Sequence, residues 1–160
     1  MTAVISSQFL NKTPLRVTWQ FYLLDPQGRF DVKGSVGAID ATLLNPLAEP
    51  MGPASIKKGR INGTEFNLRG HDYGMDGTVK FLYEDLTVTV LEKDKGVKEL
   101  DKKSLKTFIA NIAIKNSNPK KNQDVRVMQV HFDRDMNRSI FHLAWKTLFK
   151  GLRETAGLKQ

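Results

Sequence analysis

The segment from Gly74 to Leu91 is the longest uninterrupted strand-like run in the chain, and it constrains the fold more than any other stretch. Apolar residues recur at every second position from Met75 to Tyr83, which is the period of a strand with one buried face. After Glu84-Asp85 the parity changes, and the apolar row continues at Leu86, Val88 and Val90. This change of phase predicts one long strand with a kink at Glu84-Asp85, or two strands that meet there. We expect the apolar row to pass at that point from one face of the sheet to the other.

Other β-rich segments supply partners for this strand. Alternating residues at 15–23 and 30–36, joined by the turn Asp25-Pro26-Gln27-Gly28, predict a β-hairpin. Residues 56–70 predict a strand with glycine bends, and residues 125–132 predict another short strand. The proline-rich stretch from Ala41 to Pro53 interrupts the sheet, and a helical turn is expected at 43–48.

Two amphipathic helices are expected late in the chain. Residues 104–114 place Leu105, Phe108, Ile109 and Ile112 at i, i+3, i+4 and i+7. The last helix begins at a cap supplied by Asn137 or Ser139, and Gly157 lies just beyond its end. Its broad apolar stripe includes Phe141, Trp145, Leu148, Phe149 and Leu152. Residues 92–103, between the long strand and the first of these helices, are dominated by charge and predict an exposed loop.

This order of elements predicts an α+β fold, because strands come first and most of the helix comes late. We expect a long, curved antiparallel sheet with the two amphipathic helices packed on one face or at one end. A length of 160 residues is that of one domain, so residues 1–160 are interpreted as a single domain.

Composition limits the classes of function. The net charge of +8 indicates a basic surface that attracts anionic partners such as nucleic acid or phospholipid head groups. The absence of cysteine excludes disulfides, thiolate metal sites and cysteine nucleophiles. The first residues do not have the pattern of a secretory signal, and no stretch has the length of a membrane span. The chain therefore reads either as a soluble cytoplasmic protein or as a piece of a longer protein.

The densest polar constellation combines two groups, His71, Asp72 and Asp76, and His131, Asp133 and Asp135. If the two groups met, they could bind a divalent metal or perform acid–base chemistry. The spacing of metalloprotease or phosphate-loop motifs is absent from the sequence, and Arg134 would pair with the neighbouring aspartates. We therefore expect no metal, no cofactor and no enzymatic activity. A small hydrolase that uses His71 or His131 is kept as an alternative.

A basic module that binds single-stranded nucleic acid is a second alternative. Such a module needs basic and aromatic side chains interleaved on one face. Trp19, Phe21 and Tyr22 lie near Arg16 in the sequence but fall on both faces of their strand. Nucleic acid is therefore not the expected partner.

Lipid is the partner that two features favour. The last helix has a wide aromatic and aliphatic face opposed by cations, which is typical of an interfacial helix and also of a helix docked on a sheet. Long amphipathic strands with glycine bends can curl into a trough with an apolar concave side, closed by helices.

Several of these segments together resemble the C-terminal portion of large AsmA-like envelope proteins of Gram-negative bacteria. The resemblance covers about residues 31–157. It rests on the proline-rich segment, the strand motif from Tyr83 to Val88, the Asn116-Ser117-Asn118-Pro119 turn and the closing helix with Trp145-Lys146.

The resemblance implies a non-enzymatic, β-rich module of a periplasmic protein that is anchored in the inner membrane. Its sheet would contribute to an apolar groove for lipid transport and outer-membrane homeostasis, and its partners would be acyl lipid, the rest of the parent protein and a membrane surface. The chain departs from the family in having no N-terminal anchor and little of the long groove. Candidate groove or core positions are Phe81, Tyr83, Leu86, Val88 and Val90. The stripe of the last helix, Phe141 to Leu152, is the candidate surface for a membrane or partner.

Overall fold

The computed structural model describes residues 1–48, 54–92, 108–110 and 117–157. The described strands are β1 (Thr2–Phe9), β2 (Thr13–Phe21), β3 (Phe30–Val36), β4 (Ile39–Asp40), β5 (Ala54–His71), β6 (Gly74–Glu92), β7 (Phe108–Ala110) and β8 (Val127–Asp133). A 3₁₀ turn at Ala41–Leu44 leads into the single-turn helix α1 (Asn45–Ala48), and the long helix α2 (Ile140–Ala156) follows β8.

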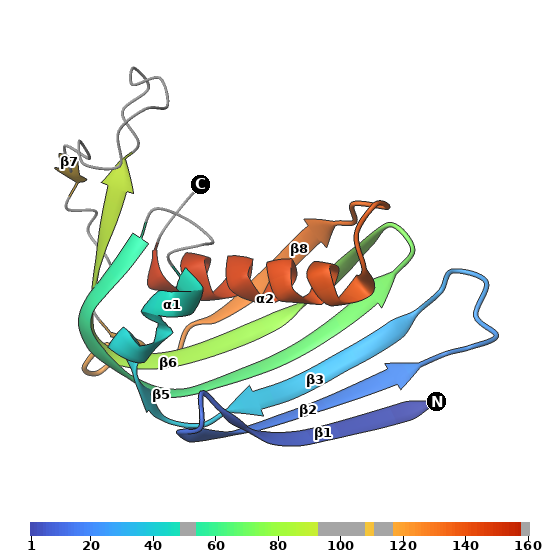
Figure 1. Ribbon diagram of the computed structural model, residues 1–160, viewed down its shortest axis with the longest axis horizontal. Helices are drawn as coiled ribbons and strands as arrows, with labels where there is room; N and C mark the ends of the chain where they lie inside the picture. The colour runs from blue at the N-terminus through green and yellow to red at the C-terminus, as the bar shows by residue number, and fades with distance from the viewer. Residues whose placement is uncertain (49–53, 93–107, 111–116, 158–160) are drawn as a thin grey trace.

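All of these strands belong to one antiparallel sheet. Its order is β1-β2-β3-β5-β6-β7, with β4 paired to β5 and β8 paired to β6. The sheet is strongly curved, and α2 lies on its concave side with α1 beside it (Figure 1). The predicted α+β class, with a long curved antiparallel sheet, is confirmed.

Strand β6 is one continuous strand, so the first of the two sequence alternatives is correct. Between the pairs Lys58–Thr87 and Arg60–Glu84, β6 contains one more residue than β5, and Asp85 has a positive φ of 49°. This is a β-bulge with the extra residue at the predicted position. The expected change of face is wrong, however, because Phe81, Tyr83 and Leu86 are buried in one cluster. The bulge absorbs the change of parity and keeps the apolar row on the concave face.

Helix α2 has the caps that the sequence predicts. The Ser139 side chain accepts a hydrogen bond from the His142 amide, and Gly157 ends the helix with a φ of 85°. The helix packs on β6 and β8 through small side chains, among them Ala144, Thr147, Gly151 and Thr155. A Cβ added at Gly151 would lie 2.5 Å from Cγ2 of Val79, so the close approach of helix and sheet requires glycine.

The first of the two predicted amphipathic helices, at residues 104–114, is not observed in the described residues. Phe108–Ala110 form strand β7, which pairs with the end of β6, and the rest of residues 104–114 lies outside the described residues. The predicted loop at 92–103 is also outside them, apart from Glu92, which ends β6. The helical turn expected at 43–48 is present as the 3₁₀ turn and α1.

The core has two clusters on the concave face of the sheet. The first lies beneath the N-terminal half of α2 and includes Trp19, Phe30, Leu68, Met75 and Leu143. The second lies near the C-terminal end of α2 and includes Ile61, Phe81, Tyr83, Leu86 and Ala156. The large core side chains come from the sheet, while α2 contributes mainly small ones.

Candidate functional site

The concave face of the sheet is apolar well beyond the area on which α2 packs. Trp19 is buried in the first core cluster, so the residues that share its parity in β2, Leu15 and Val17, also face the concave side. Both are half-buried. Ile5 of β1 pairs with Val17 and is 45% exposed. The apolar row of the concave face therefore extends from the core to the outermost strand.

One flank of α2 faces this extension. Phe141 and Trp145 are 61% and 39% exposed, and Phe149, which stacks on Trp145 with ring centroids 6.3 Å apart, is half-buried. Phe141 also contacts Trp19 of β2, with ring centroids 4.9 Å apart. On the opposite flank, Nζ of Lys150 donates to the His131 carbonyl of β8 at 2.9 Å. The aromatic flank therefore turns toward β2 and away from β8.

We call this combination the open apolar surface: Ile5, Leu15 and Val17 of the sheet with Phe141, Trp145 and Phe149 of α2. Large aromatic side chains this exposed are costly in water and are typical of surfaces that meet an apolar partner. Leu148 and Leu152 lie at the inner margin of the same flank, where they pack against the two core clusters.

The sequence suggested two groups of candidate residues, one in the last helix and one in the long strand, and the structure places them in different surroundings. The helix candidates, Phe141 to Leu152, form the aromatic flank of α2 and its inner margin. Among the strand candidates, Phe81, Tyr83 and Leu86 are buried, with exposed fractions of 6%, 0% and 4%, and so serve as core. Val88 is half-buried against the second cluster, and the side chain of Val90 lies outside the described residues. Sequence reasoning missed Ile5, Leu15 and Val17, although the alternation of β2 already placed Leu15 and Val17 on one face with Trp19.

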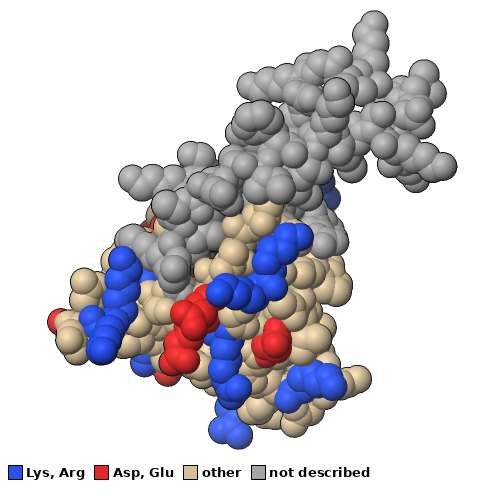
Figure 2. Space-filling model, turned by 90° about the vertical axis from the view of Figure 1, so that its left-hand side faces the viewer, with Lys and Arg blue, Asp and Glu red and all other residues tan. Residues whose placement is uncertain are grey.

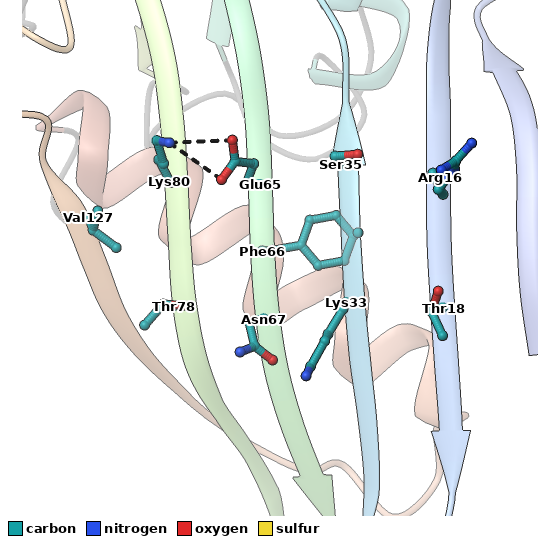
Figure 3. A pocket seen from close by; sticks show the side chains of 11 residues that line it. Arg16, Thr18, Lys33, Ser35, Glu65, Phe66, Asn67, Thr78, Lys80 and Val127 are labelled. Carbon is teal, nitrogen blue, oxygen red and sulfur yellow. Dashed lines mark hydrogen bonds and ion pairs between the residues drawn. The ribbon is translucent and has the colours of Figure 1, made fainter. Parts of the chain in front are cut away.

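The opposite, convex face of the sheet is polar. An open cavity of about 460 Å³ lies there, over the middle of β2, β3, β5 and β6 (Figure 3). Its lining includes the cations Arg16, Lys33 and Lys80 together with Glu65, and Nζ of Lys80 lies 3.3 Å from Oε1 of Glu65. Hydroxyl and amide groups complete most of the lining, at Thr18, Ser35, Asn67 and Thr78.

This arrangement does not favour the nucleic-acid alternative. Trp19 belongs to the concave core, and Phe21 packs against that core, whereas Arg16 and Lys33 lie on the convex face. These two rings and these two cations are therefore on opposite sides of the sheet, where they cannot form one stacking platform. The third ring, Tyr22, shares the parity of Arg16 and so lies on the convex face. At the end of the sheet where β5 and β6 bend, basic and acidic side chains are also interspersed (Figure 2).

The predicted polar constellation is brought together only in part. His131 of β8 lies between two carboxylates, with Nδ1 2.7 Å from Oδ1 of Asp76 and Nε2 3.0 Å from Oδ1 of Asp133. These hydrogen bonds, chiefly the one to Asp76, raise the pKa of His131 above its usual value. Both ring nitrogens of His131 therefore have a carboxylate partner in the structure.

The remaining members of the constellation have separate structural partners. Nδ1 of His71 accepts from the Tyr73 amide, Asp72 pairs with Arg134 at 3.7 Å, and Asp135 lies 3.9 Å from Arg138. In the part of the chain that the structure describes, no group of three or more His, Asp or Glu side chains is arranged to hold a metal ion.

Comparisons with known proteins add no relatives: no family model, curated protein or solved structure matches the chain. None of the described helices has the length and apolar character needed to cross a membrane.

Proposed function

We propose that this chain is a non-enzymatic lipid-handling module of an AsmA-like envelope protein, and that the open apolar surface contacts acyl chains. The observation that carries the proposal is the position of Phe141 and Trp145. Both are large and exposed, and both lie on the flank of α2 that turns toward the apolar row of β1 and β2. Exposed aromatic side chains beside an apolar sheet face give an acyl chain contact on two sides.

The rest of the proposal follows from the resemblance in the sequence. A periplasmic location, a parent protein anchored in the inner membrane and a role in lipid transport to the outer membrane are parts of that resemblance. The curved sheet with an apolar concave side supports them, because this is the form expected of a segment of a lipid-holding trough.

Lipid extraction followed by mass spectrometry tests the proposal. Phospholipid or free fatty acid should accompany the purified chain, and the double variant Phe141→Gln/Trp145→Gln should lose most of it. Both side chains are partly in water already, so these changes should leave the fold intact, as circular dichroism can verify. The matched control is Leu24→Gln, because Leu24 is 99% exposed but lies outside the open apolar surface. Absence of lipid from the unmodified chain, or equal lipid in the double variant, would show that the proposal is wrong.

A further inference from the structure

Among the described strands, β1 forms an outer edge of the sheet, and it lacks the features that normally protect such an edge. It is the first strand in the sheet order, and β2 is its partner on the inner side. Natural edge strands are usually short, bulged or interrupted by charge or proline, because unpaired backbone groups recruit other strands. The eight residues of β1, TAVISSQF, contain no charged residue and no proline in a chain whose net charge is +8.

The edge is also regular. The register with β2 runs without a shift from Thr2–Gln20 to Phe9–Thr13. Leu10 and Asn11 both have positive φ, and the Lys12 amide donates to the Phe9 carbonyl, which is a tight turn whose twist suits an antiparallel hairpin. The hairpin therefore holds β1 extended and unbulged along its full length.

The hydrogen bonds of β1 show which backbone groups point outward. Met1 and Phe21 exchange both backbone hydrogen bonds, each 2.8 Å long. Hydrogen-bonded and non-hydrogen-bonded pairs alternate along an antiparallel ladder, so the odd-numbered residues of β1 bond to β2. The even-numbered residues direct their N–H and C=O groups to the open edge: Thr2, Val4, Ser6 and Gln8.

We infer that this edge pairs with the same edge of a second copy of the chain, in antiparallel orientation about a two-fold axis. The odd-numbered residues of β1, among them Ile5, face the concave side because they pair with Trp19, Val17 and Leu15 of β2. Joining two concave sides therefore requires odd residues to oppose odd residues. Among such registers, the one that places Ile5 opposite Ile5 of the second copy bonds every outward group, with Thr2 opposite Gln8 and Val4 opposite Ser6. It also covers the exposed Ile5 side chain with an identical one, and no charged side chains oppose each other along the edge. The two sheets then form one, with a continuous concave face.

The absence of cysteine makes this register directly testable by cross-linking. In the proposed dimer, Ile5 and its copy form a non-hydrogen-bonded pair with Cα atoms about 4.5 Å apart, which is within the range for a disulfide. Ile5→Cys should therefore form a disulfide-linked dimer on mild oxidation of the purified, delipidated chain. The matched control is Val4→Cys, whose cysteines would be offset by two residues, or about 6–7 Å along the strand, and should remain unlinked.

A second variant distinguishes loss of the pairing between two copies from loss of the fold. Val4→Pro removes an outward N–H without breaking the bonds of β1 to β2, and proline is tolerated on edge strands. Sedimentation should show that the unmodified chain is a dimer and that Val4→Pro is a monomer with an unchanged circular dichroism spectrum. The double variant Ile5→Cys/Val4→Pro should not cross-link. A monomeric unmodified chain, equal cross-linking of the two cysteine variants, or cross-linking of Val4→Cys alone would overturn the inference. Because no lipid is present, failure here would leave the proposed function standing.

Discussion

The side chain of Asn118 connects two segments of the chain inside the core. It is 1% exposed, and its Nδ2 donates to the carbonyls of Phe81 at 2.6 Å and Arg126 at 3.0 Å, while its Oδ1 accepts from the Arg126 amide at 2.8 Å. The backbone of Asn118 also exchanges two hydrogen bonds with Tyr83. One amide therefore satisfies backbone groups of β6 and of the segment that enters β8.

Asn118→Ala should destabilise the fold by about 2–4 kcal/mol, because each buried group left unpaired costs about 1–3 kcal/mol. Urea unfolding followed by circular dichroism measures the change. Asn67→Ala removes an exposed asparagine on the convex face and should change the free energy of unfolding by less than about 0.5 kcal/mol. Equal unfolding midpoints for the two variants would show that the Asn118 hydrogen bonds add little.

His131 makes stability depend on pH in a defined direction. Its pKa is raised in the folded state by Asp76 and Asp133, so the folded protein holds the imidazole proton more tightly than the unfolded chain does. This contribution is fully present below the unfolded pKa of about 6.5 and is lost as pH rises through the higher folded pKa. It is small, because the side chains involved are largely exposed.

The stability difference between the unmodified chain and His131→Gln should therefore shrink as pH increases from weakly acidic to weakly alkaline. An NMR titration should give a pKa for His131 above its usual value, and Asp76→Asn should lower it by removing the main hydrogen bond. A pKa that Asp76→Asn leaves unchanged would contradict the assignment.

The sequence predicted those strands and helix ends that are determined by local sequence patterns. Alternation and turn residues located β2, β3, β5 and β8, and cap chemistry located both ends of α2. Strand β1 was not predicted, because TAVISSQF has no apolar alternation and its extended form comes from pairing with β2. Phe108 and Ile109 fit a helical period but lie in β7, where the end of β6 supplies the pairing. Tertiary pairing outweighed the local pattern in both cases.

The candidate site was predicted less completely, for a related reason. The helical period identified the apolar flank of α2, but it could not separate the exposed Phe141 and Trp145 from the partly covered Leu148. The alternation of β6 identified Phe81 and Tyr83 as apolar positions, but the packing of α2 decided that they are core. Ile5 became part of the open apolar surface only through the register of β1 on β2.

The bulge at Asp85 determines on which face the second half of β6 places its side chains. Deletion of Asp85 should shift Leu86 to the convex face, and the loss of this buried leucine should cost at least about 2–5 kcal/mol, as for a large-to-small core change. Asp85→Gly should instead be neutral or slightly stabilising, because glycine adopts the positive φ without strain. Thermal unfolding compares the two variants. A deletion variant as stable as the unmodified chain would mean that the bulge does not set the register.

For the whole molecule, the two tryptophans report separately on the core and on the open apolar surface. Trp19 is 6% exposed in the first core cluster, and Trp145 is 39% exposed on α2. If acyl chains bind where we propose, phospholipid vesicles or fatty acid should shift the emission of Trp145 to shorter wavelength, since its ring leaves water. Trp19 is already out of water and should not respond.

Single-tryptophan variants test this assignment. Trp19→Phe should retain the lipid-dependent shift, whereas Trp145→Phe should lose it while keeping the emission of a buried tryptophan. Phe141→Gln should weaken the shift in the Trp19→Phe background, because Phe141 lies on the same flank of α2, whereas Leu24→Gln should not. A shift that persists in Trp145→Phe would place the lipid elsewhere on the molecule. Lipid would then contact the sheet without the aromatic flank of α2, and the concave row of β1 and β2 would have to bind it alone.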